Sequence, residues 1–160
     1  MTAAPQLHLE DPLARVRNRA WTDYVSTFAC AISNTAYSDS EEEFAARSAK
    51  MTEPFSKLND SLAKCGNAGP FFYGPKFSLF DAAYAPFLQR YTFMDRIKPL
   101  GILEKFPHLM TWRDVLLAAP AVKASTVPNI EAVWQEGLIT RQRWLKKYVS
   151  ETVLGADAAA

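Results

Sequence analysis

Apolar side chains recur at every third or fourth position over the first part of the sequence, and this period constrains the fold most strongly. The stripe comprises Leu13, Val16, Ala20, Tyr24, Phe28 and Ile32, and Trp21 and Val25 widen it. Such a spacing places these side chains on one face of an α-helix. Asp11-Pro12 supplies a start, because aspartate caps free amides and proline loses no bond at the first helical position. The pattern predicts a helix over residues 13–37.

A second helix is predicted over residues 40–65. Ser40 and Glu43 have the spacing of a capping box, and the acidic residues around them suit the positive end of a helix dipole. Pro54 lies inside the apolar stripe of this helix and must remove one backbone hydrogen bond. We therefore expect a kink near residues 50–54 rather than a break.

The rest of the sequence predicts shorter helices separated by loops. Residues 66–77 are dense in glycine, proline and aromatic residues, which indicates a loop pinned by buried rings. Further helices are predicted over residues 78–95, 106–119, 121–126 and 130–151. No alternating strand pattern occurs, so the predicted fold class is all-α, with five or six helices in a bundle.

The chain has 160 residues, of which 49% are hydrophobic and 22% are charged, so the composition predicts one folded, soluble domain. Residues 13–151 are expected to form this domain, between a linker-like segment over 1–12 and a flexible tail over 152–160. The net charge of +1 gives no global attraction to nucleic acid or an anionic membrane. Neither a signal peptide nor a membrane span is recognisable, which favours a cytoplasmic location.

The sequence lacks the common catalytic signatures, and we predict no catalytic residue and no metal site. Its two histidines, His8 and His108, lie far apart. Cys30 and Cys65 lie on or beside apolar stripes, where a small buried thiol is the usual occupant. We therefore interpret both as reduced structural cysteines rather than as nucleophiles.

Two further groups of residues have both a functional and a structural interpretation. Residues 141–147 form a basic cluster around Trp144, which could bind nucleic acid or a membrane surface, but cations near a helix carboxyl end are also favoured by the helix dipole. We favour the dipole interpretation. Trp21, Tyr24 and Phe28 could line a ligand pocket or belong to the core, and the residues alone leave both interpretations open.

Several motifs resemble the carboxyl-terminal domain of cytosolic glutathione transferases. They are the run from Gly69 to Pro86, GPFFYGPKFSLFDAAYAP, then Phe106-Pro-His-Leu-x-x-Trp112, then Pro120-Ala-Val122. The segment over residues 7–13 is similar to the linker and helix start of bacterial members. In the family the pair at Ser78 and Asp81 forms a capping box at the start of a buried helix.

The resemblance implies the helical half of an enzyme that conjugates glutathione to small hydrophobic electrophiles in detoxification. The family's thioredoxin-like domain carries the catalytic residue and most contacts to glutathione, the co-substrate, and this sequence resembles only the part that follows it. We expect that domain as a partner in cis or in trans, and a homodimer formed through the first two helices. The chain alone is then expected to be inactive, with an exposed apolar patch that includes some of Trp21, Tyr24, Phe28 and Tyr84.

The same resemblance assigns site residues. The pocket for the hydrophobic substrate is expected between the first helix and parts of the third and last, and Trp21, Tyr24 and Phe28 are its candidate residues. Asp23 matches a position that reaches glutathione across the dimer in some bacterial relatives, although an ordinary exposed carboxylate fits it equally well. A His-Lys pair of those relatives is replaced here by Cys30 and Ala31.

Two functions from different classes remain open at the level of the sequence. The first is the substrate-binding and dimerisation half of a glutathione transferase. The second is a non-catalytic helical module for protein-protein interaction, because similar domains also assemble translation proteins.

Overall fold

Helices joined by loops build the part of the chain that the computed structural model describes, which is residues 12–65 and 69–149. They are α1 (Pro12–Ala36), α2 (Glu41–Lys50), α3 (Thr52–Lys64), α4 (Leu79–Ile97), α5 (Pro107–Ala118), α6 (Pro120–Ala124) and α7 (Ile130–Thr140), with two short 3₁₀ helices, η1 (Leu103–Lys105) and η2 (Trp144–Tyr148). No strand occurs in these two segments, so the all-α prediction is confirmed. The cap expected at Asp11, the linker before Pro12 and the tail over 152–160 lie outside them.

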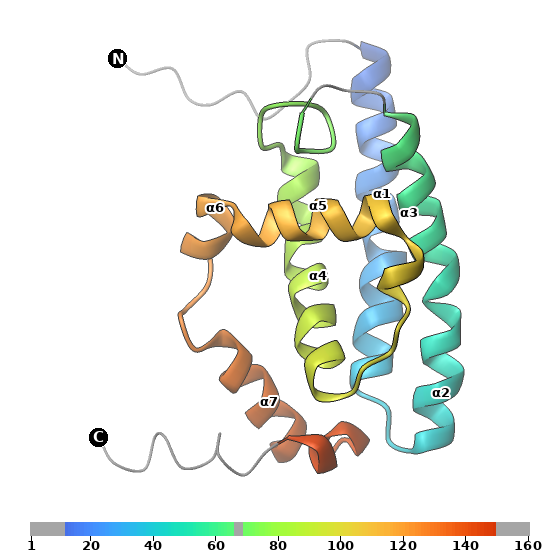
Figure 1. Ribbon diagram of the computed structural model, residues 1–160, viewed down its shortest axis with the longest axis vertical. Coiled ribbons are helices and arrows are strands. Elements are labelled where there is room, and N and C mark those ends of the chain that lie inside the picture. Colours follow the sequence, from blue (N-terminus) through green and yellow to red (C-terminus); the bar gives the residue numbers. More distant parts are fainter. Residues whose placement is uncertain (1–11, 66–68, 150–160) are drawn as a thin grey trace.

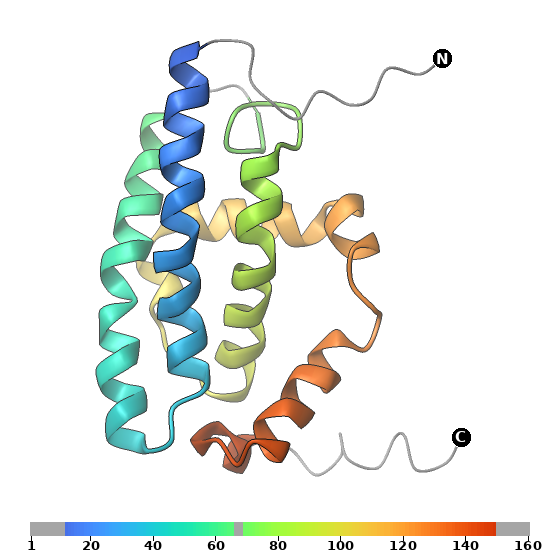
Figure 2. The ribbon, with the colours of Figure 1, turned by 180° about the vertical axis from the view of Figure 1, so that it is seen from behind.

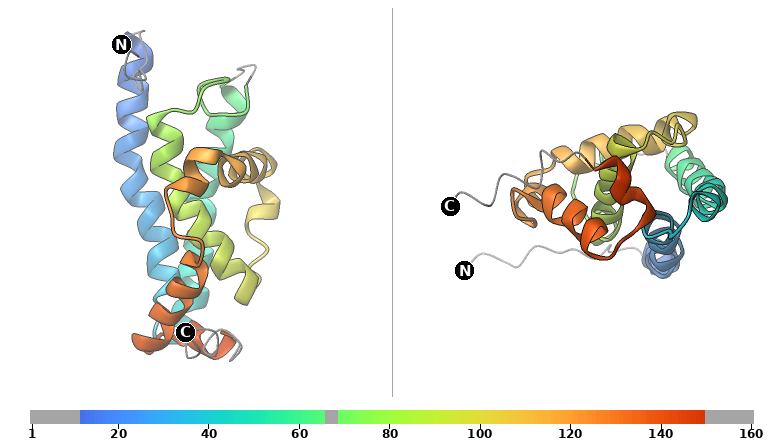
Figure 3. Two further views of the ribbon diagram at one scale, coloured as in Figure 1. Left: turned by 90° about the vertical axis from the view of Figure 1, so that its left-hand side faces the viewer. Right: turned by 90° about the horizontal axis from the view of Figure 1, so that it is seen from below.

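The long helices form an up-and-down bundle that α5 crosses. In Figure 1, α1 and α4 run in one direction and α2 and α3 run in the other, while α5 lies across α3 and α4 on one face. Figure 2 shows the opposite face, where α1 and α4 lie side by side and α7 continues beyond the lower part of α4. Seen from below, η2 reaches the end of the bundle beside the connection from α1 to α2 (Figure 3, right).

Stacked aromatic rings make up the centre of the core. Phe28 of α1 stacks on Phe55 of α3 with ring centroids 5.2 Å apart, and Tyr84 of α4 meets Phe28 edge-on at the same separation. Both Phe28 and Tyr84 are fully buried, so neither belongs to the exposed patch that the sequence led us to expect. Phe80 stacks in turn on Tyr84 at 4.6 Å. Burial of such large rings contributes most of the apolar area of the core.

The loop before α4 is pinned by aromatic rings, as the composition of this segment predicted. Over residues 69–77, Phe72 is buried and stacks on Phe80 with centroids 3.9 Å apart. Phe71 and Gly74 exchange two backbone hydrogen bonds of 3.0 and 3.1 Å. Gly74 has a φ of +121°, a backbone conformation that glycine adopts without a steric cost.

The predicted second helix is divided into α2 and α3 at Met51. The backbone of Met51 nevertheless stays helical, with φ −67° and ψ −22°, and its carbonyl accepts a 3.1 Å bond from the Phe55 amide. Pro54 has no amide hydrogen, so the Lys50 carbonyl loses its ordinary partner four residues ahead. Proline therefore separates two helices here, where we expected one kinked helix.

The last helix was predicted to reach residue 151, and this boundary was wrong. α7 ends at Thr140, and Gln142 has a φ of +56°, which turns the chain into η2. Trp144 then donates its backbone amide to the Ser38 carbonyl at 2.9 Å, and its ring lies 4.8 Å from that of Phe44. These contacts with the α1–α2 connection and with α2 stabilise η2 here, although the helical period of the segment predicts a continuous helix.

Candidate functional site

The start of α4 carries a capping box. The Ser78 hydroxyl oxygen accepts a 3.4 Å hydrogen bond from the Asp81 amide, and an Asp81 carboxylate oxygen accepts a 2.9 Å bond from the Ser78 amide. The Ser78 hydroxyl also donates to the same carboxylate at 2.5 Å. Two amides that a helix start leaves without partners are thereby satisfied, and the negative charge lies at the positive end of the helix dipole.

Asp81 also connects α4 to two other parts of the chain. Its side chain is fully buried, and its second carboxylate oxygen accepts bonds from the Phe72 amide at 3.0 Å and from Trp112 Nε1 at 2.9 Å. The loop over residues 69–77, the start of α4 and the middle of α5 therefore meet at one carboxylate. A buried anion with this many donors has a structural role, and it is not free to act as an acid or base.

The three aromatic residues proposed for the substrate pocket lie in different surroundings. Phe28 is a fully buried core residue. Tyr24 is half-buried toward α3, where the Lys57 ammonium lies 5.6 Å from its ring centroid, and burial raises the pKa of its hydroxyl. Trp21 is half-buried with its ring 5.5 Å from that of Tyr24, and its carbonyl accepts a 2.9 Å bond from the Tyr84 hydroxyl. Asp23 is exposed on α1.

A cavity of about 190 Å³ lies between α1, α4 and α7. The lining residues are Ile32, Ser33 and Ala36 of α1, Tyr37 directly after α1, Pro86, Phe87 and Arg90 of α4, and Trp134 of α7. Its walls are mostly apolar, and the small side chains on α1 keep the space open. An apolar cavity with a few polar groups is the usual form of a small-molecule site. We name this space the α1–α4–α7 cavity.

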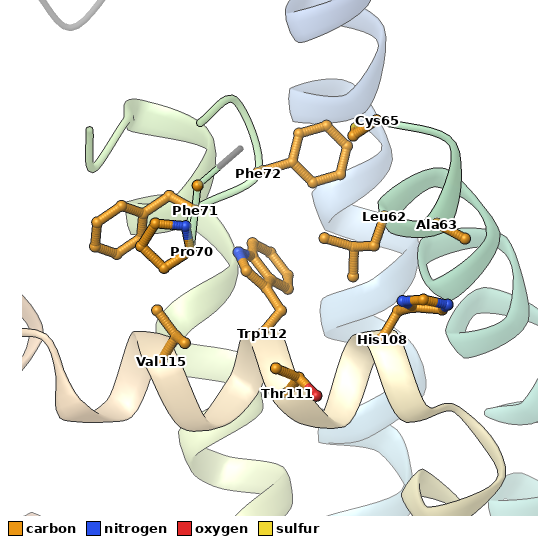
Figure 4. A pocket seen from close by; sticks show the side chains of 11 residues that line it. Leu62, Ala63, Cys65, Pro70, Phe71, Phe72, His108, Thr111, Trp112 and Val115 are labelled. Carbon is orange, nitrogen blue, oxygen red and sulfur yellow. The ribbon is translucent and has the colours of Figure 1, made fainter. Parts of the chain in front are cut away.

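A wider groove of about 430 Å³ lies on the other side of the bundle, between the end of α3, the loop over 69–72 and α5. Figure 4 shows Phe71, Phe72 and Trp112 on one part of it and His108 beside Leu62 on another. Trp112 Nε1 is already bonded to Asp81, and the His108 amide donates to Asn59 Oδ1 at 3.0 Å. Burial raises the pKa of the Cys65 thiol, so this groove presents no activated nucleophile.

The comparisons with known proteins bear on the fold of this chain and not on its chemistry. The family model described as "Glutathione S-transferase, C-terminal domain" matches residues 41–114, from the start of α2 into α5. This segment includes the Ser78–Asp81 capping box and its partner Trp112. A solved structure of similar fold is a Tau class glutathione S-transferase from mango, Mangifera indica, with a TM-score of 0.70, 26% identity and 84% of this chain covered.

The chain is an all-helical domain that resembles the C-terminal domain of glutathione S-transferases. It spans 63% of the length of the mango transferase chain. The similar structure comes from a plant, and the bacterial character inferred from residues 7–13 stays a prediction.

The cavity of this transferase-like domain lies between the elements predicted for a substrate pocket, but different residues line it. Trp21, Tyr24 and Phe28 are not among those residues. The sequence analysis missed Tyr37, Phe87, Arg90 and Trp134. The signal that could have found them is the pairing of small residues on α1, Ser33 and Ala36, with Pro86 on α4, since small side chains leave room between helices.

The two cysteines differ in exposure, which corrects their common interpretation as buried thiols. Cys30 is exposed on α1 and Cys65 is half-buried at the end of α3, and neither forms a disulfide. We expect Ellman's reagent to modify Cys30 several-fold faster than Cys65 at pH 8, because burial limits access to Cys65 and raises its pKa. Rates measured on Cys30→Ser and Cys65→Ser compare the two thiols one at a time. A faster reaction at Cys65 would contradict this order.

The basic cluster over residues 141–147 is largely engaged within the domain. Arg143 forms an ion pair with Asp39 at 2.5 Å, and the Lys147 ammonium lies 4.1 Å from the Trp144 ring centroid and 3.8 Å from Glu41. These contacts hold η2 against the α1–α2 connection and the start of α2. Within residues 12–65 and 69–149 no group of acidic, histidine or cysteine side chains could hold a metal ion, and none of their helices is long and apolar enough to cross a membrane.

Proposed function

We propose that this chain is the electrophile-binding half of a glutathione S-transferase. The single observation that carries the proposal is the apolar α1–α4–α7 cavity within a domain that resembles this family. The reaction is attack of the glutathione thiolate on a hydrophobic electrophile. The chain's part is to hold that electrophile against the rings of Phe87 and Trp134 and to exclude water from it.

Thiolate formation requires a separate group of donors. The glutathione thiol resembles a free cysteine, with a pKa of roughly 8.5, so only a few per cent of it ionises at neutral pH without assistance. In the family that this chain resembles, a thioredoxin-like domain supplies that assistance. We propose that a thioredoxin-like domain, in cis or in trans, binds glutathione and supplies this activation, with Asp23 of α1 adding a contact to glutathione.

The proposed partner domain has an available face. Helix α5 covers the far side of the bundle, whereas no described helix crosses in front of α1 and α4 in Figure 2. We propose that the thioredoxin-like domain docks on this face. We further propose, on the family resemblance alone, a cytoplasmic homodimer formed through α1, α2 and α3 that acts in detoxification.

The test compares this 160-residue chain with the same chain joined to a glutathione transferase thioredoxin-like domain. Conjugation of glutathione to 1-chloro-2,4-dinitrobenzene is expected from the joined protein and from neither part alone. In the joined protein, Phe87→Ala should raise KM for the halide several-fold and leave KM for glutathione unchanged. Val133→Ala, at an exposed position of α7 outside the cavity, is the matched control.

Two outcomes would overturn this proposal. Conjugation by the isolated chain would show that it carries its own activating group. A joined protein that folds and stays inert would instead favour the non-catalytic interaction module.

A further inference from the structure

Electric charge is unevenly distributed around the α1–α4–α7 cavity. Of the described residues that line it, Arg90 alone is charged. Its guanidinium lies 5.5 Å from the ring centroid of Phe93, and Nη1 donates to Gln89 Oε1 at 2.8 Å. Within the described segments Arg90 forms no ion pair with a carboxylate.

Arg90 is half-buried, and it keeps its positive charge without a carboxylate partner in the described segments. Burial lowers the pKa of Arg90, and the nearby Tyr37 hydroxyl opposes this change. Arginine nevertheless remains protonated at neutral pH, because its ordinary pKa lies far above that range. Of the five N–H donors of the guanidinium, the described segments bond one, to Gln89.

Two more arginines add positive charge at the Tyr37 side of the cavity. The guanidinium carbons of Arg141 and Arg143 lie 5.9 and 6.0 Å from the Tyr37 ring centroid. Arg143 is neutralised by Asp39, whereas the one hydrogen bond of the Arg141 side chain within the described segments goes to the Gly137 carbonyl. Arg90 and Arg141 therefore place two cations without a carboxylate partner in the described segments near Tyr37, although the whole chain carries a net charge of only +1.

The rest of the cavity suits a hydrocarbon ring. Phe87 and Trp134 provide aromatic walls, and Ile32 closes the α1 side. A closed cavity of roughly 150 Å³ accepts benzene in another protein, so a volume of about 190 Å³ here admits one or two fused rings.

We infer that the α1–α4–α7 cavity selects ligands that combine an aromatic body with a carboxylate, and that Arg90 binds the carboxylate. This inference rests on the proposed function and names the substrate class of the same cavity. The planar guanidinium matches a carboxylate with two parallel hydrogen bonds, while the rings of Phe87 and Trp134 contact the apolar body. Arg90 then makes the cavity bind acidic electrophiles more tightly than neutral ones.

The test measures binding of 2-naphthoate and of its neutral analogue 2-naphthamide to the full chain by titration calorimetry. Arg90→Gln should weaken naphthoate binding about 10- to 100-fold, the range expected for loss of charge-assisted hydrogen bonds, and change naphthamide binding less than about twofold. Arg90→Lys keeps the charge but loses the paired donors, so its naphthoate affinity should lie between those of wild type and Arg90→Gln.

Two control variants locate the effect. Arg96→Gln removes an arginine of the same helix that pairs with Glu131 outside the cavity, and it should bind both probes as wild type does. Phe87→Ala should weaken both probes by the same factor, because the two share the aromatic body. Circular dichroism of each variant confirms that it folds.

Several results would overturn the inference. They are equal affinity for the two probes in wild type, an unchanged naphthoate affinity in Arg90→Gln, no binding of either probe, and displacement of naphthoate by glutathione. The last result would show that Arg90 serves glutathione itself. None of these results depends on conjugation activity, so failure here is distinguishable from failure of the joined protein to act as a transferase.

Discussion

Asp81→Ala is expected to lower the free energy of unfolding by roughly 3–6 kcal/mol, the largest effect that we predict for a single polar side chain. The buried carboxylate accepts bonds from Ser78, Phe72 and Trp112, which belong to three separate parts of the chain. Alanine leaves the Phe72 amide and Trp112 Nε1 without this acceptor in a dry environment. Each buried donor left unpaired costs about 1–3 kcal/mol, and the lost cap of α4 adds to this cost.

Graded variants separate these contributions. Asp81→Asn keeps one acceptor oxygen for Phe72 and Trp112 but turns an amide donor toward the Ser78 amide, so it should be less destabilising than Asp81→Ala. Ser78→Ala removes only the cap and should cost about 0.5–2 kcal/mol. Combined with Asp81→Ala, it should be less than additive, because the two side chains act as one unit.

Urea denaturation followed by circular dichroism measures these differences. Asp60→Ala, at an exposed position of α3, is the control and should change stability by less than about 0.5 kcal/mol. An Asp81→Ala variant that unfolds at the wild-type midpoint would show that the carboxylate does not hold α4, α5 and the loop together.

The sequence determines the helices of this domain wherever local signals are strong. The Ser78–Asp81 spacing predicts the start of α4 because a capping box needs only four consecutive residues. Pro107 and Pro120 likewise open α5 and α6, since proline suits the first position of a helix. For Ser40 the local signal is only partly realised, because Glu43 bonds to the Asp39 amide instead of the Ser40 amide.

Contacts between distant residues are what the sequence could not predict. The end of α7 depends on the contacts of Trp144 with Ser38 and Phe44, a hundred or more positions earlier, and the helical period of residues 130–151 does not predict those contacts. The cavity raises the same difficulty. Its elements were expected from the family resemblance, but Arg90 and Trp134 become neighbours only once α7 lies against α4.

The second large effect concerns Phe28, which the sequence analysis assigned to the substrate pocket and the structure places in the core. Phe28→Ala is expected to lower the free energy of unfolding by roughly 3–5 kcal/mol, the usual cost of removing a buried phenyl ring. The cost lies near the upper end because Phe55 and Tyr84 both lose a ring contact at 5.2 Å. Thermal and urea unfolding measure this change.

Tyr24→Ala provides the matched comparison, one turn earlier on the same helix. The Tyr24 ring is only half-buried, so its loss should cost no more than about 1.5 kcal/mol, and a cavity in the core does not form. If Phe28 contacted ligand instead of core, Phe28→Ala would leave stability close to that of Tyr24→Ala and weaken 2-naphthamide binding. That result would contradict its placement among Phe55 and Tyr84. The expected result, a large loss of stability for Phe28 and a small one for Tyr24, removes Phe28 from the candidate ligand contacts on α1.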